Sequence, residues 1–273
     1  MNTEVREPDL PGAADAIELT EGLRRPLLAL VRCIDDPNLP VPGLRWNAGE
    51  VCAHMVSGLE AYREMLCGQE SPHLSLDVAK INRQNDAGVA SVVDRSGPGL
   101  AQRLAAGFGA LHTELASPDL PALVPWHGGL HMPPACIATF IATDMAVHGY
   151  DLARALRRDW TIDPRLADAC VRALGPVLPH LLDRDAAAGF RATFLLRLRK
   201  QGTYTLHFDD GTLRLLTGWT GPVDARISAE PATYLLSMFH RLGRVGPALR
   251  GEVVVYGRRP WRVLRLDKLL PIP

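Results

Sequence analysis

The first half of the chain carries the three- and four-residue hydrophobic spacing of amphipathic helices. Asn47 precedes one such pattern, and Glu50 stands three residues later, which is a typical helix start. We therefore predict four helical regions, the third broken near Ser96: 13–34, 47–66, 76–116 and 134–156. Four long helices joined by modest loops indicate a four-helix bundle.

After residue 158 the pattern changes to short, alternating, β-rich segments. Asp209, Asp210 and Gly211 separate two of them and predict a hairpin turn. The expected strands are 192–198, 203–208, 212–215, 225–229 and 253–256, and the expected helices are 163–182, 231–242 and 260–269. The sequence thus predicts two domains, a helical bundle over residues 1–158 and a smaller α+β domain over residues 163–273.

Charge and composition exclude several classes of partner. The 273 residues include 30 basic and 30 acidic side chains, and the pI is near 7.1, so no excess of positive charge attracts nucleic acid or an anionic membrane. The longest apolar stretches are shorter than the roughly 18 residues of a membrane-spanning helix. Residues 1–9 lack a secretory signal pattern, so we expect a cytoplasmic protein with reduced cysteines.

Candidate metal chemistry lies on two of the predicted helices. Asp144 and His148 are four residues apart, so they share one helical face about one turn from each other. His54 lies on an otherwise apolar surface of the helix that begins at residue 47. In a bundle, two such helices can direct ligands to one point, and two imidazoles with one carboxylate can hold a divalent ion.

Each of these residues also has a structural interpretation. A single histidine on an apolar face is commonly a hydrogen-bonded core residue, and an Asp/His pair at helical spacing is commonly a surface interaction. Asp151 can cap the helix, pair with Arg154 or Arg157, or orient His148 by a hydrogen bond. Spacing alone leaves these alternatives open.

Three segments resemble one known family. The stretch from Arg45 to His54 (RWNAGEVCAH) resembles the Trp-then-His helix of the mycothiol-dependent maleylpyruvate isomerase family. The stretch from Asp144 (DMAVHGYDLARAL) resembles its second signature. Residues 203–266 resemble the sterol-carrier-like domain that follows the bundle in this family. The resemblance implies a DinB-like metal-binding four-helix bundle followed by a sterol-carrier-like α+β domain.

The resemblance also implies a set of site residues. The family's metal ligands correspond to His54, Asp144 and His148, and the implied ion is divalent, with zinc favoured. At position 144 the family more usually has glutamate, which is one methylene longer. Only three of the 30 basic residues are lysines, which favours a GC-rich, actinobacterial genome.

Substrate contacts are expected from arginines, because planar guanidinium groups bind carboxylates in a bidentate manner. Arg83 corresponds to the family's third region, and Arg241 and Arg244 lie at the end of the predicted helix 231–242. His127 and His131, in a loop before residue 134, are candidates for proton transfer or simply an exposed loop, and we assign no catalytic residue.

The resemblance implies an enzyme with mycothiol as co-substrate. We expect a thiol S-transferase that acts on a small electrophilic metabolite, because the thiol can add to an electrophilic carbon and remain there. The alternatives are a cis/trans isomerase of the maleylpyruvate type and a non-catalytic protein that binds a small molecule or lipid. No nucleic acid or membrane partner is expected, and the protein is expected to be a monomer or homodimer.

Overall fold

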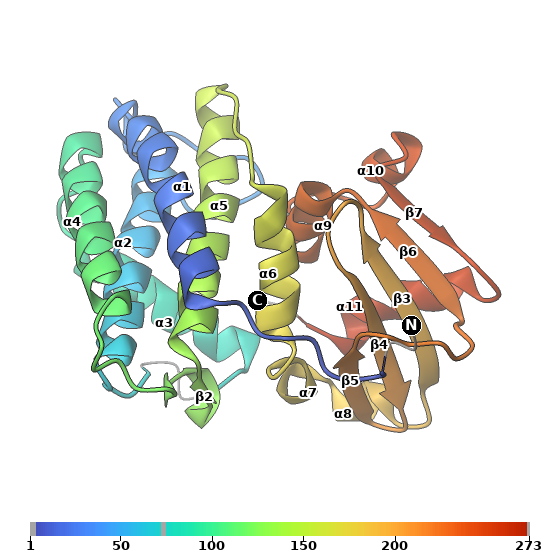
Figure 1. Ribbon diagram of the computed structural model, residues 1–273. Coiled ribbons are helices and arrows are strands. Elements are labelled where there is room, and N and C mark those ends of the chain that lie inside the picture. Colours follow the sequence, from blue (N-terminus) through green and yellow to red (C-terminus); the bar gives the residue numbers. More distant parts are fainter. Residues whose placement is uncertain (1–3, 72–74, 272–273) are drawn as a thin grey trace. The chain divides into compact units, whose positions relative to one another are not determined.

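The computed structural model describes residues 4–71 and 75–271 and divides into two compact units (Figure 1). One unit comprises residues 11–162, and the other comprises residues 163–273 together with the N-terminal segment. The first is helical and the second combines helices with a five-stranded sheet. The predicted fold class, a helical bundle followed by an α+β region, is confirmed.

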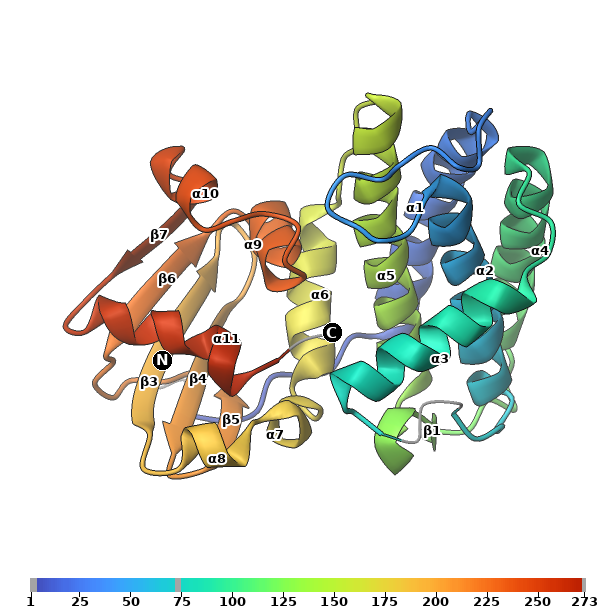
Figure 2. The ribbon, with the colours of Figure 1, turned by 180° about the vertical axis from the view of Figure 1, so that it is seen from behind.

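Four helices pack side by side in the N-terminal unit: α1 (Ala13–Arg32), α2 (Ala48–Leu66), α4 (Gly97–Leu115) and α5 (Pro134–Leu156). The third predicted helical region, 76–116, consists of two separate helices, α3 (Val78–Ser91) and α4. Figure 2 shows α3 crossing α2 at a steep angle, outside the four-helix arrangement. The break falls just before Ser96, whose side chain accepts a hydrogen bond from Gly99 N at the start of α4.

Local signals in the sequence explain where the site-bearing helices begin. Asn47 caps α2: its side chain accepts from Glu50 N, and the Glu50 carboxylate accepts from Asn47 N, both at 2.9 Å. Pro134 occupies the first turn of α5, where a missing N–H costs nothing. Gly149 allows the Trp160 indole to lie against α5, since a Cβ there would be 2.1 Å from the ring.

The C-terminal unit is built on one mixed sheet in the order β5-β4-β3-β6-β7. Its strands are β3 (Arg191–Leu198), β4 (Thr203–Asp209), β5 (Thr212–Leu216), β6 (Ala225–Ala229) and β7 (Val253–Tyr256). β3 and β6 are parallel and the other pairs are antiparallel. The predicted hairpin is confirmed: Asp210 and Gly211 both have positive φ between β4 and β5, as a two-residue turn requires.

Helices and short segments accompany the sheet: α6 (Pro164–Leu174), α7 (Leu178–Leu181), α8 (Arg184–Ala187), α9 (Pro231–Met238), α10 (Val245–Leu249), η2 (Pro260–Arg265) and α11 (Leu266–Leu269). The helix predicted over 231–242 is shorter than expected, because α9 ends at Met238 and His240 adopts a positive φ. Arg241 and Arg244 therefore lie beyond the helix.

The N-terminal segment departs from the predicted domain division. Residues 4–10 group with the C-terminal unit, whereas the sequence pattern placed them with the bundle. The reason is a backbone pairing: Arg6 N donates to Thr217 O at 3.2 Å, and Thr217 N donates to Arg6 O at 2.7 Å. Within the described residues no helix is long and apolar enough to span a membrane.

Candidate metal centre

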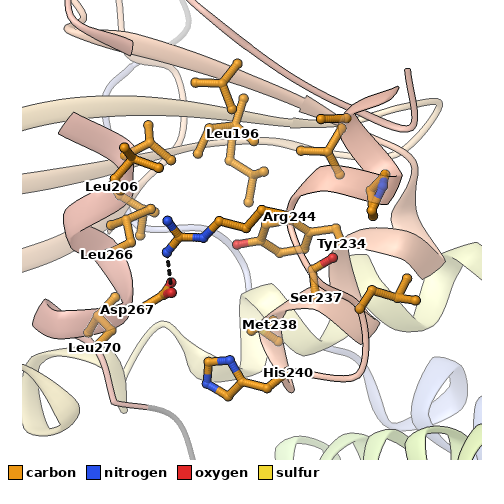
Figure 3. Close-up of a pocket in the computed structure, with 18 of the residues that line it drawn as sticks. Leu196, Leu206, Tyr234, Ser237, Met238, His240, Arg244, Leu266, Asp267 and Leu270 are labelled. Atoms are coloured by element: carbon orange, nitrogen blue, oxygen red, sulfur yellow. Dashed lines mark hydrogen bonds and ion pairs between the residues drawn. The ribbon is translucent and has the colours of Figure 1, made fainter. Parts of the chain in front are cut away.

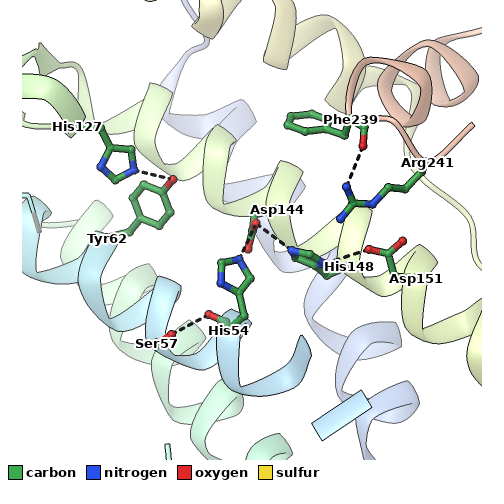
Figure 4. Close-up of polar contacts among 9 residues, drawn as sticks. All are labelled: His54, Ser57, Tyr62, His127, Asp144, His148, Asp151, Phe239 and Arg241. Carbon is green, nitrogen blue, oxygen red and sulfur yellow. Dashed lines mark hydrogen bonds and ion pairs between the residues drawn. The ribbon is translucent and has the colours of Figure 1, made fainter. Parts of the chain in front are cut away.

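The three predicted metal ligands converge on one point inside the bundle (Figure 4). His54 extends from α2, and Asp144 and His148 extend from successive turns of α5. Their ligand atoms all lie within 4.8 Å of one another. Both His54 Nε2 and His148 Nε2 face Asp144 Oδ1, at 3.4 and 3.5 Å. Residues 90 positions apart in the sequence thus form one cluster.

Two of these separations have the length expected around a single divalent ion. Zinc bonds of about 2.0–2.1 Å in a tetrahedron give ligand-to-ligand edges of about 3.3–3.4 Å. The two imidazole-to-carboxylate separations are close to that length, and the ligand atoms of all three residues lie within 4.8 Å of one another. The side chains of His54 and His148 are 12% and 9% exposed, whereas that of Asp144 is 28% exposed. The cluster is enclosed on the histidine side and open to a further ligand beside the carboxylate.

Asp151 settles the orientation of His148. Its carboxylate, 1% exposed, lies 3.1 Å from His148 Nδ1. A carboxylate only accepts hydrogen bonds, so Nδ1 carries a hydrogen, and in the neutral form of the ring the lone pair of Nε2 faces Asp144 Oδ1. A cation between Nε2 and Oδ1 would be bound by both acceptors. Of the three alternatives that spacing left open for Asp151, the structure shows the orienting contact.

Trp46 and Asp86 shape the wall beside His54. The Trp46 ring lies 4.9 Å from the His54 ring, and its indole N–H donates to Asp86 of α3 at 3.2 Å. Arg45 forms an ion pair with the same carboxylate and lies over the Trp46 ring. These contacts hold the pKa of Asp86 below its usual range, chiefly through the hydrogen bond from Arg45. Through Asp86, α3 therefore holds the Trp46 ring in place against the candidate ligand His54.

A second series of polar contacts joins α2 to the loop before α5. Ser71 Oγ lies 2.7 Å from His127 Nδ1, and His127 Nε2 lies 3.2 Å from Tyr62 Oη. Burial raises the pKa of Tyr62, and the nearby Asp144 carboxylate raises it further, so the hydroxyl stays protonated. Tyr62 was not among the candidates that the sequence pattern indicated. Its position eight residues after His54, on the same face of α2, was the available signal.

The group of three candidate ligands does not include the other residues that the sequence singled out. His131 is exposed on the short strand β2 (His131–Met132). Cys52, two residues from His54 and not predicted as a ligand, is buried, and burial raises the pKa of its thiol, which disfavours a thiolate. Arg83 is exposed on α3. Arg241 and Arg244 belong to the C-terminal unit, where Arg241 donates to Phe239 O at 2.8 Å and Arg244 pairs with Asp267. A substrate contact by these arginines stays a prediction.

The chain resembles known proteins in structure over both units and in sequence over the bundle. No curated protein matches the sequence. The crystal structure of the mycothiol-dependent maleylpyruvate isomerase is similar over 85% of this chain and 90% of its own, at 12% identity and a TM-score of 0.54. A histidine-to-alanine mutant of the mycothiol-dependent maleylpyruvate isomerase is similar over 89% and 92%, at 11% identity and a TM-score of 0.55. At such identities these likenesses establish the fold.

The sequence of the bundle shows to which family this unit belongs. Residues 20–153 match the model of the mycothiol maleylpyruvate isomerase N-terminal domain. This range covers α2 and most of α5, and therefore all three residues of the His54–Asp144–His148 cluster. The N-terminal unit of this chain belongs to the mycothiol maleylpyruvate isomerase N-terminal domain family.

Proposed function

We propose that this protein is a mycothiol-dependent enzyme that holds a divalent metal ion, zinc by preference, with His54, Asp144 and His148. The observation that carries the proposal is the 3.4 and 3.5 Å spacing of two imidazole nitrogens about one carboxylate oxygen. That donor set suits zinc and leaves a position for an exogenous ligand. Membership of the bundle in the mycothiol maleylpyruvate isomerase family supports mycothiol as that ligand.

The chain's own residues would prepare this chemistry. When bound, a divalent ion supplies a lowered thiol pKa, so that a thiolate exists at neutral pH without a protein cysteine. Asp151 holds His148 in the tautomer whose Nε2 is free to ligate. Trp46 covers His54 and excludes water from one side. Tyr62 keeps its proton and can donate a hydrogen bond to an anionic group near Asp144.

The expected reaction is thiol transfer. The mycothiol sulfur, having lost its proton, forms a C–S bond to an electrophilic carbon of a small metabolite. In an unsaturated acid or an epoxide, the electron pair of the C=C π bond or the C–O bond that breaks takes up a proton. In an alkyl halide, the electron pair of the broken bond leaves with the halide ion. Arg83 and Arg241 are proposed to hold acidic groups of thiol or acceptor, since guanidinium pairs well with carboxylates. The guanidinium of Arg244 already pairs with Asp267 and would have to leave that carboxylate to do the same. The product then keeps the sulfur.

Isomerisation is the second candidate, favoured by the likeness of fold to a maleylpyruvate isomerase. It uses the same addition. Rotation about the single bond of the adduct, followed by cleavage of the C–S bond, returns the thiol and yields the other geometric isomer. The two functions differ only in whether the C–S bond persists.

Mass spectrometry separates these outcomes. The zinc-loaded full chain is incubated with mycothiol and either maleylpyruvate or a panel of α,β-unsaturated acids, epoxides and alkyl halides. A stable adduct mass supports transfer, and conversion of maleylpyruvate with unchanged mycothiol supports isomerisation. Either activity should disappear in His54→Ala and persist in His112→Ala, which removes an exposed histidine of α4. Unchanged thiol and unchanged acceptors throughout, at full metal occupancy, would refute the proposed function.

A further inference from the structure

The two edges of the five-stranded sheet differ in what pairs with them. In the strand order β5-β4-β3-β6-β7, the edge strands are β5 and β7. The β5 edge carries the N-terminal segment, because Arg6 forms an antiparallel bridge with Thr217, the residue directly after β5. In the part of the chain that the structure describes, β7 pairs with β6 alone. Figure 1 shows β7 at this open edge.

The backbone groups of two β7 residues face the open edge. Glu230 N donates to Glu252 O at 2.7 Å, in the same register in which β6 pairs with β7. Hydrogen bonds between antiparallel strands fall on alternate residues, so the residues at even positions of β7 turn their backbone groups toward β6. The N–H and C=O groups of Val253 and Val255 therefore point away from the sheet, where an added strand can bind them.

The side chains of β7 do not protect this edge. Natural edge strands are commonly protected by charged residues or proline, and β7 contains neither. Its residues Val254, Val255 and Tyr256 are 42%, 38% and 49% exposed. An exposed apolar edge strand is typical of a sheet that accepts a strand from another chain.

The two faces of the sheet beside β7 differ in chemistry. The face toward a cavity of about 680 Å³ is apolar, with Leu196, Leu206 and Val255 among the lining residues (Figure 3). Directly paired residues point to the same face. On the opposite face, paired residues of β3, β6 and β7 form two rows: Leu195, Arg226 and Tyr256, then Arg197, Ser228 and Val254. A strand added to β7 would extend the apolar face on one side and the arginine-bearing face on the other.

The arginine-bearing face has positive charge that no carboxylate matches. Arg197 and Arg226 are exposed on β3 and β6, and Arg258 is exposed two residues after β7. Among the described residues none of these three arginines forms an ion pair. Asp224 and Glu252, the carboxylates near the two ends of β7, already pair with other arginines. A partner at this edge is therefore favoured if it brings negative charge.

The occupied β5 edge shows the kind of segment that this sheet accepts. Residues 4–10 (EVREPDL) carry three carboxylates and one arginine. Arg6 of this segment makes the backbone bridge, and the Glu7 carboxylate lies 4.0 Å from the guanidinium of Arg214 on β5. The open β7 edge offers the same combination of free backbone groups and nearby arginine side chains.

We propose that the β7 edge binds an extended, acidic segment of a partner protein. The segment adds a sixth strand through hydrogen bonds to Val253 and Val255, and its acidic side chains lie on the same face as Arg226 and Arg258. Its backbone would lie about 10 Å from β6, two strand spacings away, so a glutamate and the long side chain of Arg226 can meet above Tyr256. A second copy of β7 fits less well, because it would place two positively charged faces side by side.

Three fluorescein-labelled peptides test the chemistry of the partner. The first is a seven-residue peptide of alternating valine and glutamate, the second has lysine in place of each glutamate, and the third is the acidic peptide with its backbone amides N-methylated. Anisotropy titrations with the full chain should show that the acidic peptide binds at least about tenfold more tightly than either of the others. Equal affinity of the N-methylated peptide would refute strand addition, and tighter binding of the lysine peptide would refute the acidic class.

A matched pair of arginine variants tests the location. Arg226→Glu should weaken binding of the acidic peptide at least about tenfold and strengthen binding of the lysine peptide, because the charge beside the added strand is reversed. Arg32→Glu, at an exposed arginine in the last turn of α1, should change neither affinity. Both positions are exposed, so both variants should keep the circular dichroism spectrum of the unmodified chain.

Two further results would overturn the proposal. One is equal affinity of the Arg226→Glu and Arg32→Glu variants for the acidic peptide, or no saturable binding of that peptide by the unmodified chain. The other is a dimer of the unmodified chain, detected by sedimentation, that Val255→Pro dissociates. Proline removes the outward N–H at this edge position, so that result would assign the β7 edge to a second copy of the chain.

Discussion

The bundle and the C-terminal unit each contain a candidate site, and the two sites are built from opposite materials. In the bundle, four polar side chains, His54, Asp144, His148 and Asp151, are gathered among closely packed helices. In the C-terminal unit, an apolar sheet face borders a cavity of about 680 Å³. The first arrangement costs desolvation of polar groups, and the second costs lost packing.

Removal of a candidate metal ligand should have the largest effect, and that effect should be confined to the site in the bundle. His54→Ala should lower zinc affinity by more than about a hundredfold, because a site with three protein ligands tolerates little loss. The fold should not change, because the three residues are proposed ligands and not packing residues. Zinc content after dialysis, measured by elemental analysis on untagged protein, checks the first expectation, and circular dichroism of the same sample checks the second. His112→Ala is the control, and zinc retained at full stoichiometry by His54→Ala would contradict the ligand assignment.

Removal of the orienting carboxylate should have the next largest effect. Asp151→Asn keeps the size of the side chain but removes the charge that holds His148 Nδ1–H. Zinc affinity should fall by about 10- to 100-fold with all three ligands intact, as is usual for residues that orient a ligating histidine. Competition with a zinc chelator measures the change. Asp159→Asn, at an exposed position, is the matched control; equal affinities for the two variants would mean that Asp151 has only a structural role.

The contrast in packing can be measured with two leucines. Leu104 of α4 is fully buried in the bundle, and Leu206 of β4 is 6% exposed beside the cavity. Leu104→Ala should lower the free energy of unfolding by about 2–5 kcal/mol, because it creates a new void. Leu206→Ala should cost about 1–2 kcal/mol less, since it only enlarges an existing one. Urea unfolding followed by circular dichroism compares them, and an equal or greater loss for Leu206→Ala would contradict the cavity.

The sequence predicted features that depend on local spacing better than those that depend on long-range packing. The pair of Asp144 and His148 is local to one helix, and the Asn47 cap is local to its first turn, so both were predictable. The contact of His54 with Asp144 spans 90 residues; the bundle pattern offered it as one alternative, and resemblance to a family favoured it. Tyr62 was missed because its partner His127 comes from a loop whose path no periodicity specifies.

The hydrophobic pattern could not predict the C-terminal cavity either, because the cavity also depends on long-range packing. The alternation in 192–198 and 253–256 predicts apolar sheet faces, but it does not reveal whether a helix covers them closely. The pairing of Arg6 with Thr217 is likewise invisible, because a single bridge leaves no hydrophobic period. Strand pairing and the end of α9 at Met238, four residues earlier than expected, together decide where space remains.

The smallest expected effect concerns Asp144, where the related family usually has glutamate. Its carboxylate already lies 3.4 and 3.5 Å from the two imidazole nitrogens, so aspartate reaches the ligand position as it stands. Its side chain is 28% exposed, which gives an added methylene room toward solvent. Asp144→Glu should therefore change zinc affinity by less than about tenfold and avoid the usual overpacking cost of about 1–3 kcal/mol.

Zinc affinity and melting temperature measured on one Asp144→Glu sample test this expectation, with Asp15→Glu at an exposed position of α1 as the control. A gain in affinity of more than about a hundredfold would show that aspartate does not reach the ion, because such a gain exceeds what improved orientation alone usually contributes. A lower melting temperature with no zinc bound to either form would identify Asp144 as a packed structural residue, and the metal assignment would fall with it. Retained zinc and an unchanged melting temperature would show that the shorter carboxylate serves the same site, with the difference in length absorbed on the solvent side.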